Sequence, residues 1–174
     1  MNLIITGNPG VGKHTIADEM MKTGDYDLFD INKIAFESKN IEKDESSVEV
    51  DVENLKNHLK NKLSKKSLIV GHLAPYVVNK SDIDLVIVLR KNPYKLAETY
   101  ELRRYSKEKI KENLGSEILG IITHDSLLEF GSEKTFQVDV TSKTPNQVLE
   151  KIQNIIKEQN HNDEIDSLSE IHQN

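Results

Sequence analysis

The sequence predicts an α/β fold in which helices cover both faces of a parallel sheet, and three observations support this prediction. Apolar runs of strand length recur along the 174 residues, and helical periods separate most of them. Two of the runs are apolar throughout, as expected of strands buried on both faces. The five runs are Asn2–Thr6, Tyr26–Asp30, Ser67–Val70, Asp84–Leu89 and Thr135–Val140.

The first run leads into a glycine-rich loop and then into a helix. Residues 7–13 read Gly-Asn-Pro-Gly-Val-Gly-Lys, which matches G-x-x-x-x-G-K. Ile16 and Met20 then lie on one face of the predicted helix. Glycines let successive backbone N–H groups curve around an anion, the helix N-terminus adds positive partial charge, and Lys13 reaches the β and γ phosphates. This order favours a nucleotide site over a glycine turn that binds nothing.

The residue after the lysine departs from the motif, because His14 stands where Ser or Thr usually binds magnesium. A hydroxyl follows one position later, in Thr15. The loop therefore raises the question of whether the chain transfers phosphoryl groups or only holds a nucleotide.

The middle of the chain supplies the remaining core elements. Because they are apolar without alternation, Ser67–Val70 and Asp84–Leu89 are predicted to be the central strands. Pro93 and Pro145 stand where helices begin. The predicted helices, beyond the one after the loop, are Asn54–Ser64, Tyr94–Tyr105, Lys107–Phe130 and Pro145–Glu158.

Two polar stretches interrupt this pattern. Glu37–Asp51 has almost no apolar residues, so we expect an excursion from the core. Gln159–Asn174 has only isolated apolar residues and is predicted to be a disordered tail, which leaves 1–158 as one domain.

Composition narrows the classes of function. The net charge of −6 and the pI near 5.5 argue against strong autonomous nucleic-acid binding. The run of lysines in 56–66 is interpreted as a solvated helix face, with RNA contact as the alternative. Because no cysteine occurs, disulfides and thiol catalysis are excluded. Met1 leads directly into a strand without a signal peptide, so we expect a cytoplasmic protein without membrane segments.

A second motif bears on which nucleotide the loop would bind. Residues 79–82, Asn-Lys-Ser-Asp, match the guanine-reading pattern N-K-x-D. They precede a strand, whereas the guanine motif follows one, and no D-x-x-G lies between them and the loop. We interpret the match as a polar turn.

The segment after the third strand carries a histidine where an acid is usual. Leu68 to His72 reads Leu-Ile-Val-Gly-His, without the carboxylate that normally positions magnesium. His72 is expected at the carboxyl edge of the sheet beside the loop, where open α/β sheets bind ligands. The alternative role is to cap the strand.

Arginine is scarce, with only Arg90, Arg103 and Arg104 in the chain. Two of them lie together at the end of one predicted helix, just before the next, where a guanidinium can close on a bound triphosphate. We expect this role for Arg103 more than for Arg104; the alternative is a surface arginine at a helix C-terminus.

In order and spacing, these pieces resemble the adenylate kinase isoenzyme 6 family of small archaeal and nuclear NTPases. The matching pieces, which cover about residues 1–158, are the loop at 7–13, Asp51-Val-Glu53, Ile69-Val-Gly-His72, Asp84 to Arg90, Leu102-Arg-Arg-Tyr105, Lys109-Ile110, Glu112-Asn113 and Glu117 to Gly120.

The resemblance implies the fold of a nucleoside monophosphate kinase, a P-loop NTPase with five parallel strands, a monophosphate-binding flap at 30–53 and a short lid at 103–113. It also implies ATP, Mg²⁺ and AMP as ligands, adenylate kinase and ATPase activities, and a small-subunit ribosomal protein and pre-ribosomal particle as partners in rRNA maturation. By position, Lys13, Arg103 and His72 would act in catalysis and Thr15 would meet the metal. The nucleotide would contact Gly10, Val11, Gly12, Lys13, His14, Thr15, Arg103 and Thr144, the last beside adenine.

Two departures from the family pattern bear on activity. Val70 stands where the family usually has Asp or Glu, and residues 1–89 contain no arginine to clamp an acceptor phosphate. Lys33 or Lys39 would have to supply that charge without the planar guanidinium fork. A slow adenylate kinase and ATPase is therefore one hypothesis. The alternatives are a nucleotide-gated ribosome assembly factor with little turnover and a kinase for another small molecule.

Overall fold

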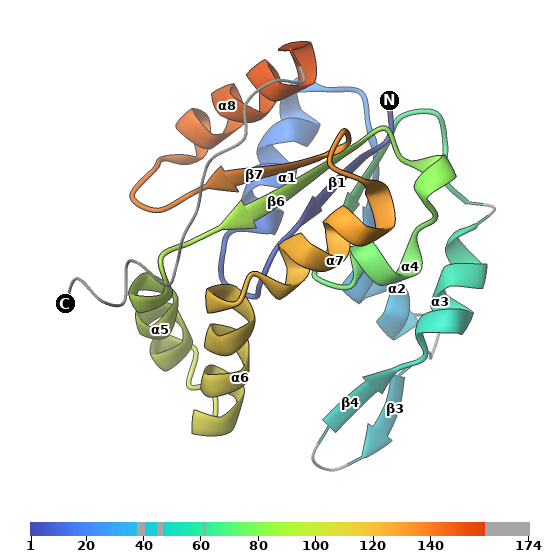
Figure 1. The fold of residues 1–174 in the computed structure, drawn as a ribbon. Coiled ribbons are helices and arrows are strands. Elements are labelled where there is room, and N and C mark those ends of the chain that lie inside the picture. The colour runs from blue at the N-terminus through green and yellow to red at the C-terminus, as the bar shows by residue number, and fades with distance from the viewer. Residues whose placement is uncertain (38–40, 45–46, 61, 159–174) are drawn as a thin grey trace.

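The chain folds around one five-stranded parallel sheet, as predicted for a P-loop kinase, and the strand order is β2-β5-β1-β6-β7 (Figure 1). The computed structural model describes residues 1–37, 41–44, 47–60 and 62–158. The tail predicted at 159–174 lies outside the described residues. The strands of the sheet are β1 (Leu3–Thr6), β2 (Asp27–Asp30), β5 (Ser67–Val70), β6 (Leu85–Arg90) and β7 (Thr135–Asp139).

The middle of the sheet differs from the prediction. β5 and β6 are inner strands, but β1 lies between them and is the central strand. Ile4 of β1 is in register with Ile69 of β5 and with Val86 of β6. All four residues of β1 are buried, as are those of β5 and β6, so apolar residues without alternation mark the inner strands but not their order.

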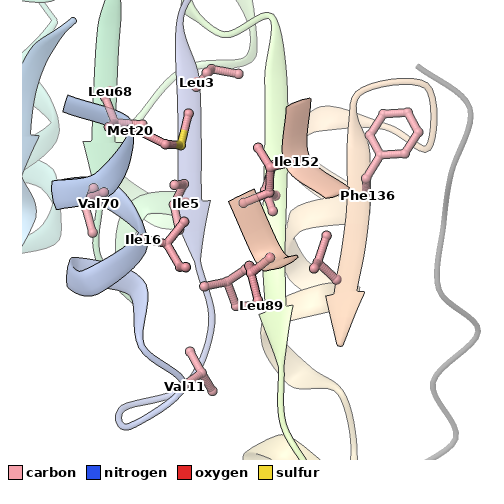
Figure 2. Packing of buried hydrophobic residues seen from close by; sticks show 14 of the residues in the cluster. Leu3, Ile5, Val11, Ile16, Met20, Leu68, Val70, Leu89, Phe136 and Ile152 are labelled. Atoms are coloured by element: carbon pink, nitrogen blue, oxygen red, sulfur yellow. The ribbon is translucent and has the colours of Figure 1, made fainter. Parts of the chain in front are cut away.

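Helices cover both faces of the sheet, and alternate residues of the strands face opposite layers. Leu3 and Ile5 face the layer of α1, α5 and α8, as Figure 2 shows in part, whereas Ile4 faces the layer of α2, α3, α4 and α7. The helices of the described residues are α1 (Lys13–Thr23), α2 (Ile31–Glu37), α3 (Val52–Leu59), α4 (Ala74–Val77), α5 (Pro93–Leu102), α6 (Lys107–Ile118), α7 (Ile121–Phe130) and α8 (Pro145–Glu158).

The prediction of a single helix over Lys107–Phe130 is wrong, because the structure has two helices there, α6 and α7. Gly120 has a φ of 63°, a left-handed conformation that glycine adopts without a Cβ penalty and that ends a helix. The break turns the chain so that α6 lies beside α5 while α7 covers the sheet (Figure 1).

The polar excursion predicted over Glu37–Asp51 contains an element that the prediction did not include. β3 (Ile41–Asp44) and β4 (Ser47–Val50) pair antiparallel as a separate two-stranded sheet, projecting away from the five-stranded sheet in Figure 1. Asp51 then caps α3 by accepting a hydrogen bond from the amide of Asn54 at 2.9 Å. The proposed flap over 30–53 therefore comprises α2, this hairpin and the start of α3.

Within the described ranges, the helices are all too short or too polar to cross a membrane.

Candidate active site

The glycine loop joins the carboxyl end of β1 to the first turn of α1. Gly12 precedes the helix with a φ of 95°, which favours glycine, and gives the first turn no side-chain cap. The first amides of α1 thus keep their capacity to donate to an anion.

Lys13 is held inside this loop. Its Nζ donates to the carbonyl oxygens of Gly7 at 2.9 Å and Asn8 at 2.8 Å, and the residue is 5% exposed. Burial, helped by the nearby charge of Arg103, lowers the pKa of Lys13 to about 8, although Glu117 and Asp30 oppose the shift. A phosphate that takes the place of the two carbonyls would remove the electrostatic cost of this buried ammonium.

A cavity of about 780 Å³ opens beside the loop. Its described lining contains three cationic side chains, from Lys13, Arg103 and Lys109, and no Asp or Glu. A cavity of this size and charge suits a polyanionic small molecule. The other polar lining residues are Asn8, His14, Thr15, Asn32, His72, Tyr76, Tyr105, Asn113 and Ser116.

Most of the predicted site residues meet in this cavity, namely Gly10, Gly12, Lys13, His14, Thr15, His72 and Arg103. Val11 does not line it with its side chain, which is 4% exposed and packs in the core (Figure 2). Only the main chain of Val11 is therefore available to a ligand. Thr144 lies outside the cavity walls on the exposed turn before α8, where its hydroxyl is 3.3 Å from the side-chain oxygen of Gln147.

His72 lies two residues after the end of β5 and is partly buried in the cavity wall. Burial lowers its pKa, and the charges of Lys13 and Lys109 lower it further. The neutral imidazole therefore predominates at pH 7 and can accept as well as donate a hydrogen bond.

The two adjacent arginines have different surroundings. Arg103 ends α5 and its side chain lines the cavity. Arg104 has a φ of 56° and does not contribute to the lining. Arg103 therefore lies where a cavity ligand could reach it, and its role there stays a prediction.

His14 points to a carboxylate beside the cavity. Its Nε2 lies 3.0 Å from Oδ2 of Asp30, the last residue of β2. The other oxygen of Asp30 accepts hydrogen bonds from the amides of Asn32 and Lys33, at the start of α2. His14 therefore links the glycine loop to the first turn of the proposed flap.

Residues suited to hold a divalent cation are few. Val70 is fully buried in the core, so the strand that usually supplies an acid has none (Figure 2). Among the described residues, no group of three His, Cys, Asp or Glu side chains could hold a metal ion. The hydroxyl of Thr15 lines the cavity and fits a cation that arrives with phosphate oxygens and water as its other ligands.

The structure adds a buried network that the sequence-based prediction missed. Glu117, at the end of α6, is 1% exposed and accepts hydrogen bonds from Asn8 at 2.7 Å and from Arg90 at 2.8 Å. Arg90 also donates to Gln137 of β7 at 2.7 Å. The network fixes the second residue of the glycine loop to α6 and β6.

Lys109, Asn113 and Ser116 of α6 were also not predicted as site residues. They line the cavity at spacings of four and three residues, as expected for one face of a helix. Polar residues at helical spacing after the adjacent arginines were the available sequence signal.

The Asn79-Lys80-Ser81-Asp82 match lies away from this site. It forms a turn and a 3₁₀ segment before the amino end of β6. The side-chain amide of Asn79 donates to the carboxylate of Asp82 at 3.2 Å. The glycine loop follows the carboxyl end of the parallel strand β1, at the opposite edge of the sheet. The interpretation as a polar turn is confirmed.

Comparison with known proteins gives matches over most of the chain. A family model described as "AAA domain" matches residues 3–120. A protein of Thermococcus kodakarensis named "Putative adenylate kinase" is 35% identical over 158 residues, covering 90% of this chain and 86% of that protein. Proteins of the same name from Pyrococcus furiosus and Methanococcus maripaludis are 35% and 34% identical, covering 90% and 87% of this chain and 84% and 86% of their own length.

A solved structure shares the fold. Deoxyadenosine kinase from M. mycoides, solved with the products dCMP and a flexible dCDP bound, superposes with a TM-score of 0.56 at 18% identity. The match covers 92% of this chain and 100% of that chain.

Proposed function

We propose that this chain, which belongs to the archaeal adenylate kinase-like family of P-loop proteins, transfers the γ-phosphoryl group of MgATP to AMP and, more slowly, to water. In the kinase reaction a phosphate oxygen of AMP bonds to the γ-phosphorus. The bond from that phosphorus to the bridging oxygen breaks, and two molecules of ADP leave. Such a transfer asks the protein for positioning and charge more than for covalent chemistry.

The single observation that carries the proposal is the cavity beside the glycine loop. Lys13, Arg103 and Lys109 line it without an acidic residue among its described walls. No carboxylate of the described residues lies within 4 Å of these three cations. A cavity that concentrates positive charge in this way favours a triphosphate and the charge that develops during its transfer.

The roles follow from position. Lys13 would meet the β and γ phosphates from the first turn of α1, and the loop amides of Gly10, Val11, Gly12 and His14 would surround them. Arg103 would close on the phosphates from the end of α5. His72, neutral at pH 7, would accept or donate a hydrogen bond at the carboxyl end of β5. By resemblance, Thr144 would lie near adenine.

Magnesium would enter as part of the MgATP substrate. The cation neutralises phosphate charge and orients the transferred group. Thr15 would provide its hydroxyl ligand, and phosphate oxygens and water the rest. Because Val70 offers no carboxylate, we expect weak retention of the metal and slow turnover.

The acceptor would occupy the part of the cavity lined by α2, α4 and the start of α7. Ala35, Leu73 and Ile121 give this part apolar surface. Tyr76 is held there by a hydrogen bond to Asp125. Burial, with this hydrogen bond, raises the pKa of Tyr76 to about 12 and keeps it a neutral phenol. An apolar wall with a fixed aromatic suits a planar base.

Calorimetric titration and a coupled assay test the proposal. We expect heat on addition of MgATP and Mg²⁺-dependent ADP formation that increases when AMP is added. Lys13→Ala should abolish both, whereas Lys22→Ala, on the exposed end of the same helix, should change neither. A wild-type protein without heat of ATP binding would refute the proposal.

A second candidate function is supported by the sparse site. The apolar Val70 and the arginine-free first 89 residues favour a nucleotide-gated assembly factor of the adenylate kinase isoenzyme 6 type, which binds a small-subunit ribosomal protein during rRNA maturation. This role rests on the resemblance of the sequence motifs. ATP binding together with turnover that ignores AMP would favour it over the kinase. A turnover that instead rises with a nucleoside or coenzyme precursor would favour a different small-molecule kinase.

A further inference from the structure

Lys109 occupies the first turn of α6 and reaches the cavity beside the glycine loop. Its backbone amide donates to the Oγ of Ser106, the N-cap residue, at 3.2 Å. Its side chain lines the cavity, and its Nζ lies 4.3 Å from the centroid of the Tyr105 ring. This cation–π contact holds the ammonium over one wall of the site.

A chain of contacts connects Lys109 to the glycine loop. The Tyr105 ring stacks on Tyr100, with centroids 5.4 Å apart and an interplanar angle of 15°. Tyr100 is fully buried, and its hydroxyl donates to the carbonyl oxygen of Pro9 at 2.7 Å. The ammonium is therefore positioned relative to the loop by packed rings and not by a flexible side chain alone.

Lys109 lies at the positive end of a helix and has no carboxylate partner among the described residues. A cation in the first turn opposes the positive end of the helix dipole. No carboxylate of the described residues lies within 4 Å of its Nζ, whereas Lys22, Lys80 and Lys95 each have one. An ammonium that a ring holds beside a cavity, without a carboxylate partner, is a candidate for binding an anion.

Arg103 and Lys109 both line the cavity, and their charges act on different neighbours. Arg103 acts electrostatically on Lys13, at the loop after β1. Lys109 acts on His72, at the end of the neighbouring strand β5. The cavity continues from there toward Asn32 and Tyr76, the proposed acceptor side. With ATP bound at the glycine loop, the Lys109 ammonium near His72 would therefore face the terminal phosphate, which points to the acceptor.

We propose that Lys109 binds the terminal phosphate of ATP and thereby makes the site prefer ATP to ADP. The inference rests on the proposed function, because it requires ATP to bind at the glycine loop. An ammonium that contacts only the γ-phosphate adds affinity for ATP and none for ADP.

Titration calorimetry with MgATP and with MgADP tests this role in the full-length chain. For Lys109→Met we expect ATP affinity to fall about tenfold and ADP affinity to stay within about twofold, since one charged hydrogen bond is lost with one ligand only. Lys109→Arg keeps the charge and should keep most of the preference. The matched controls are Lys107→Met and Lys111→Met, which remove exposed charges of the same helix outside the cavity lining and should leave both affinities unchanged.

The outcomes separate this inference from the proposed function. Equal weakening of ATP and ADP, or none, in Lys109→Met would overturn the role of Lys109 while ATP binding by the wild type stood. A similar loss in Lys107→Met would also overturn it, since a general charge effect would then suffice. A wild type that binds neither nucleotide would overturn both.

Discussion

The side-chain amide of Asn8 donates to the carboxylate of Glu117 at 2.7 Å, joining the glycine loop to a helix 109 residues further along the chain. Arg90 donates to the other carboxylate oxygen at 2.8 Å. All three residues are at most 5% exposed. The loop is therefore supported by a buried network whose three members come from three separate elements, and two of the members, Arg90 and Glu117, form an ion pair.

Removal of the Glu117 carboxylate should destabilise the fold. In Glu117→Ala the buried Arg90 loses the carboxylate that lies 2.8 Å from its Nε and Asn8 loses its acceptor, so we expect a loss of about 3–5 kcal/mol in the free energy of unfolding. Glu117→Gln retains an acceptor and should lose less. Urea denaturation measures both. Glu112→Ala, exposed on the same helix, should stay within about 0.5 kcal/mol of wild type, and a comparable loss there would contradict the argument.

This contact explains why part of the site could not be predicted. The glycine loop, Lys13 and His72 were predictable because a local motif and the common carboxyl edge of parallel strands bring them together. The pairing of Asn8 with Glu117 depends on where α6 ends, and that end is set by the turn at Gly120. Glycine within a helical pattern is often tolerated, so the pattern alone predicted one long helix.

Local sequence patterns also failed to predict the strand order of the sheet and the presence of the hairpin. Burial on both faces makes the inner strands visible as apolar runs, but strand order depends on crossovers that the runs do not encode. β3 and β4 pair only with each other, and their four-residue runs, Ile-Glu-Lys-Asp and Ser-Val-Glu-Val, are too short and polar to stand out as strands in the sequence.

Arg103 and Arg104 should respond differently to substitution. Arg103→Ala removes a cavity cation, and we expect turnover to fall about a hundredfold, as when one charge-stabilising donor is lost. Arg104→Gly relieves a left-handed conformation and should raise stability by about 1 kcal/mol with turnover unchanged. Steady-state kinetics measures turnover, and thermal unfolding measures stability, in both variants. A large loss of turnover in Arg104→Gly would contradict the assignment of roles.

Thr15 rather than His14 should control the response to magnesium. Thr15→Val removes the hydroxyl at nearly constant shape, so half-maximal turnover should require about tenfold more Mg²⁺, the equivalent of one lost ligand bond. His14→Ala removes only the partly exposed pair with Asp30, which is worth about 0–1 kcal/mol, and should change the Mg²⁺ requirement little. Measuring turnover against Mg²⁺ concentration compares the two variants. A larger increase of the Mg²⁺ requirement in His14→Ala than in Thr15→Val would assign the metal contact to His14.

ATP binding should weaken as the pH rises above about 8. Burial, with Arg103, lowers the pKa of Lys13 to about 8, so the free protein loses this charge above that pH. A bound triphosphate favours the ammonium and raises its pKa, and binding must then take up one proton. Linkage predicts a roughly tenfold increase in Kd per pH unit above 8 and little change between about 7.5 and 8.

Calorimetry in buffers of different ionisation enthalpy measures the proton uptake directly. Lys13→Arg keeps its charge throughout this range and should bind more weakly but without the pH dependence. A wild-type Kd that stays constant to pH 9.5 would show that Lys13 remains protonated in the free protein.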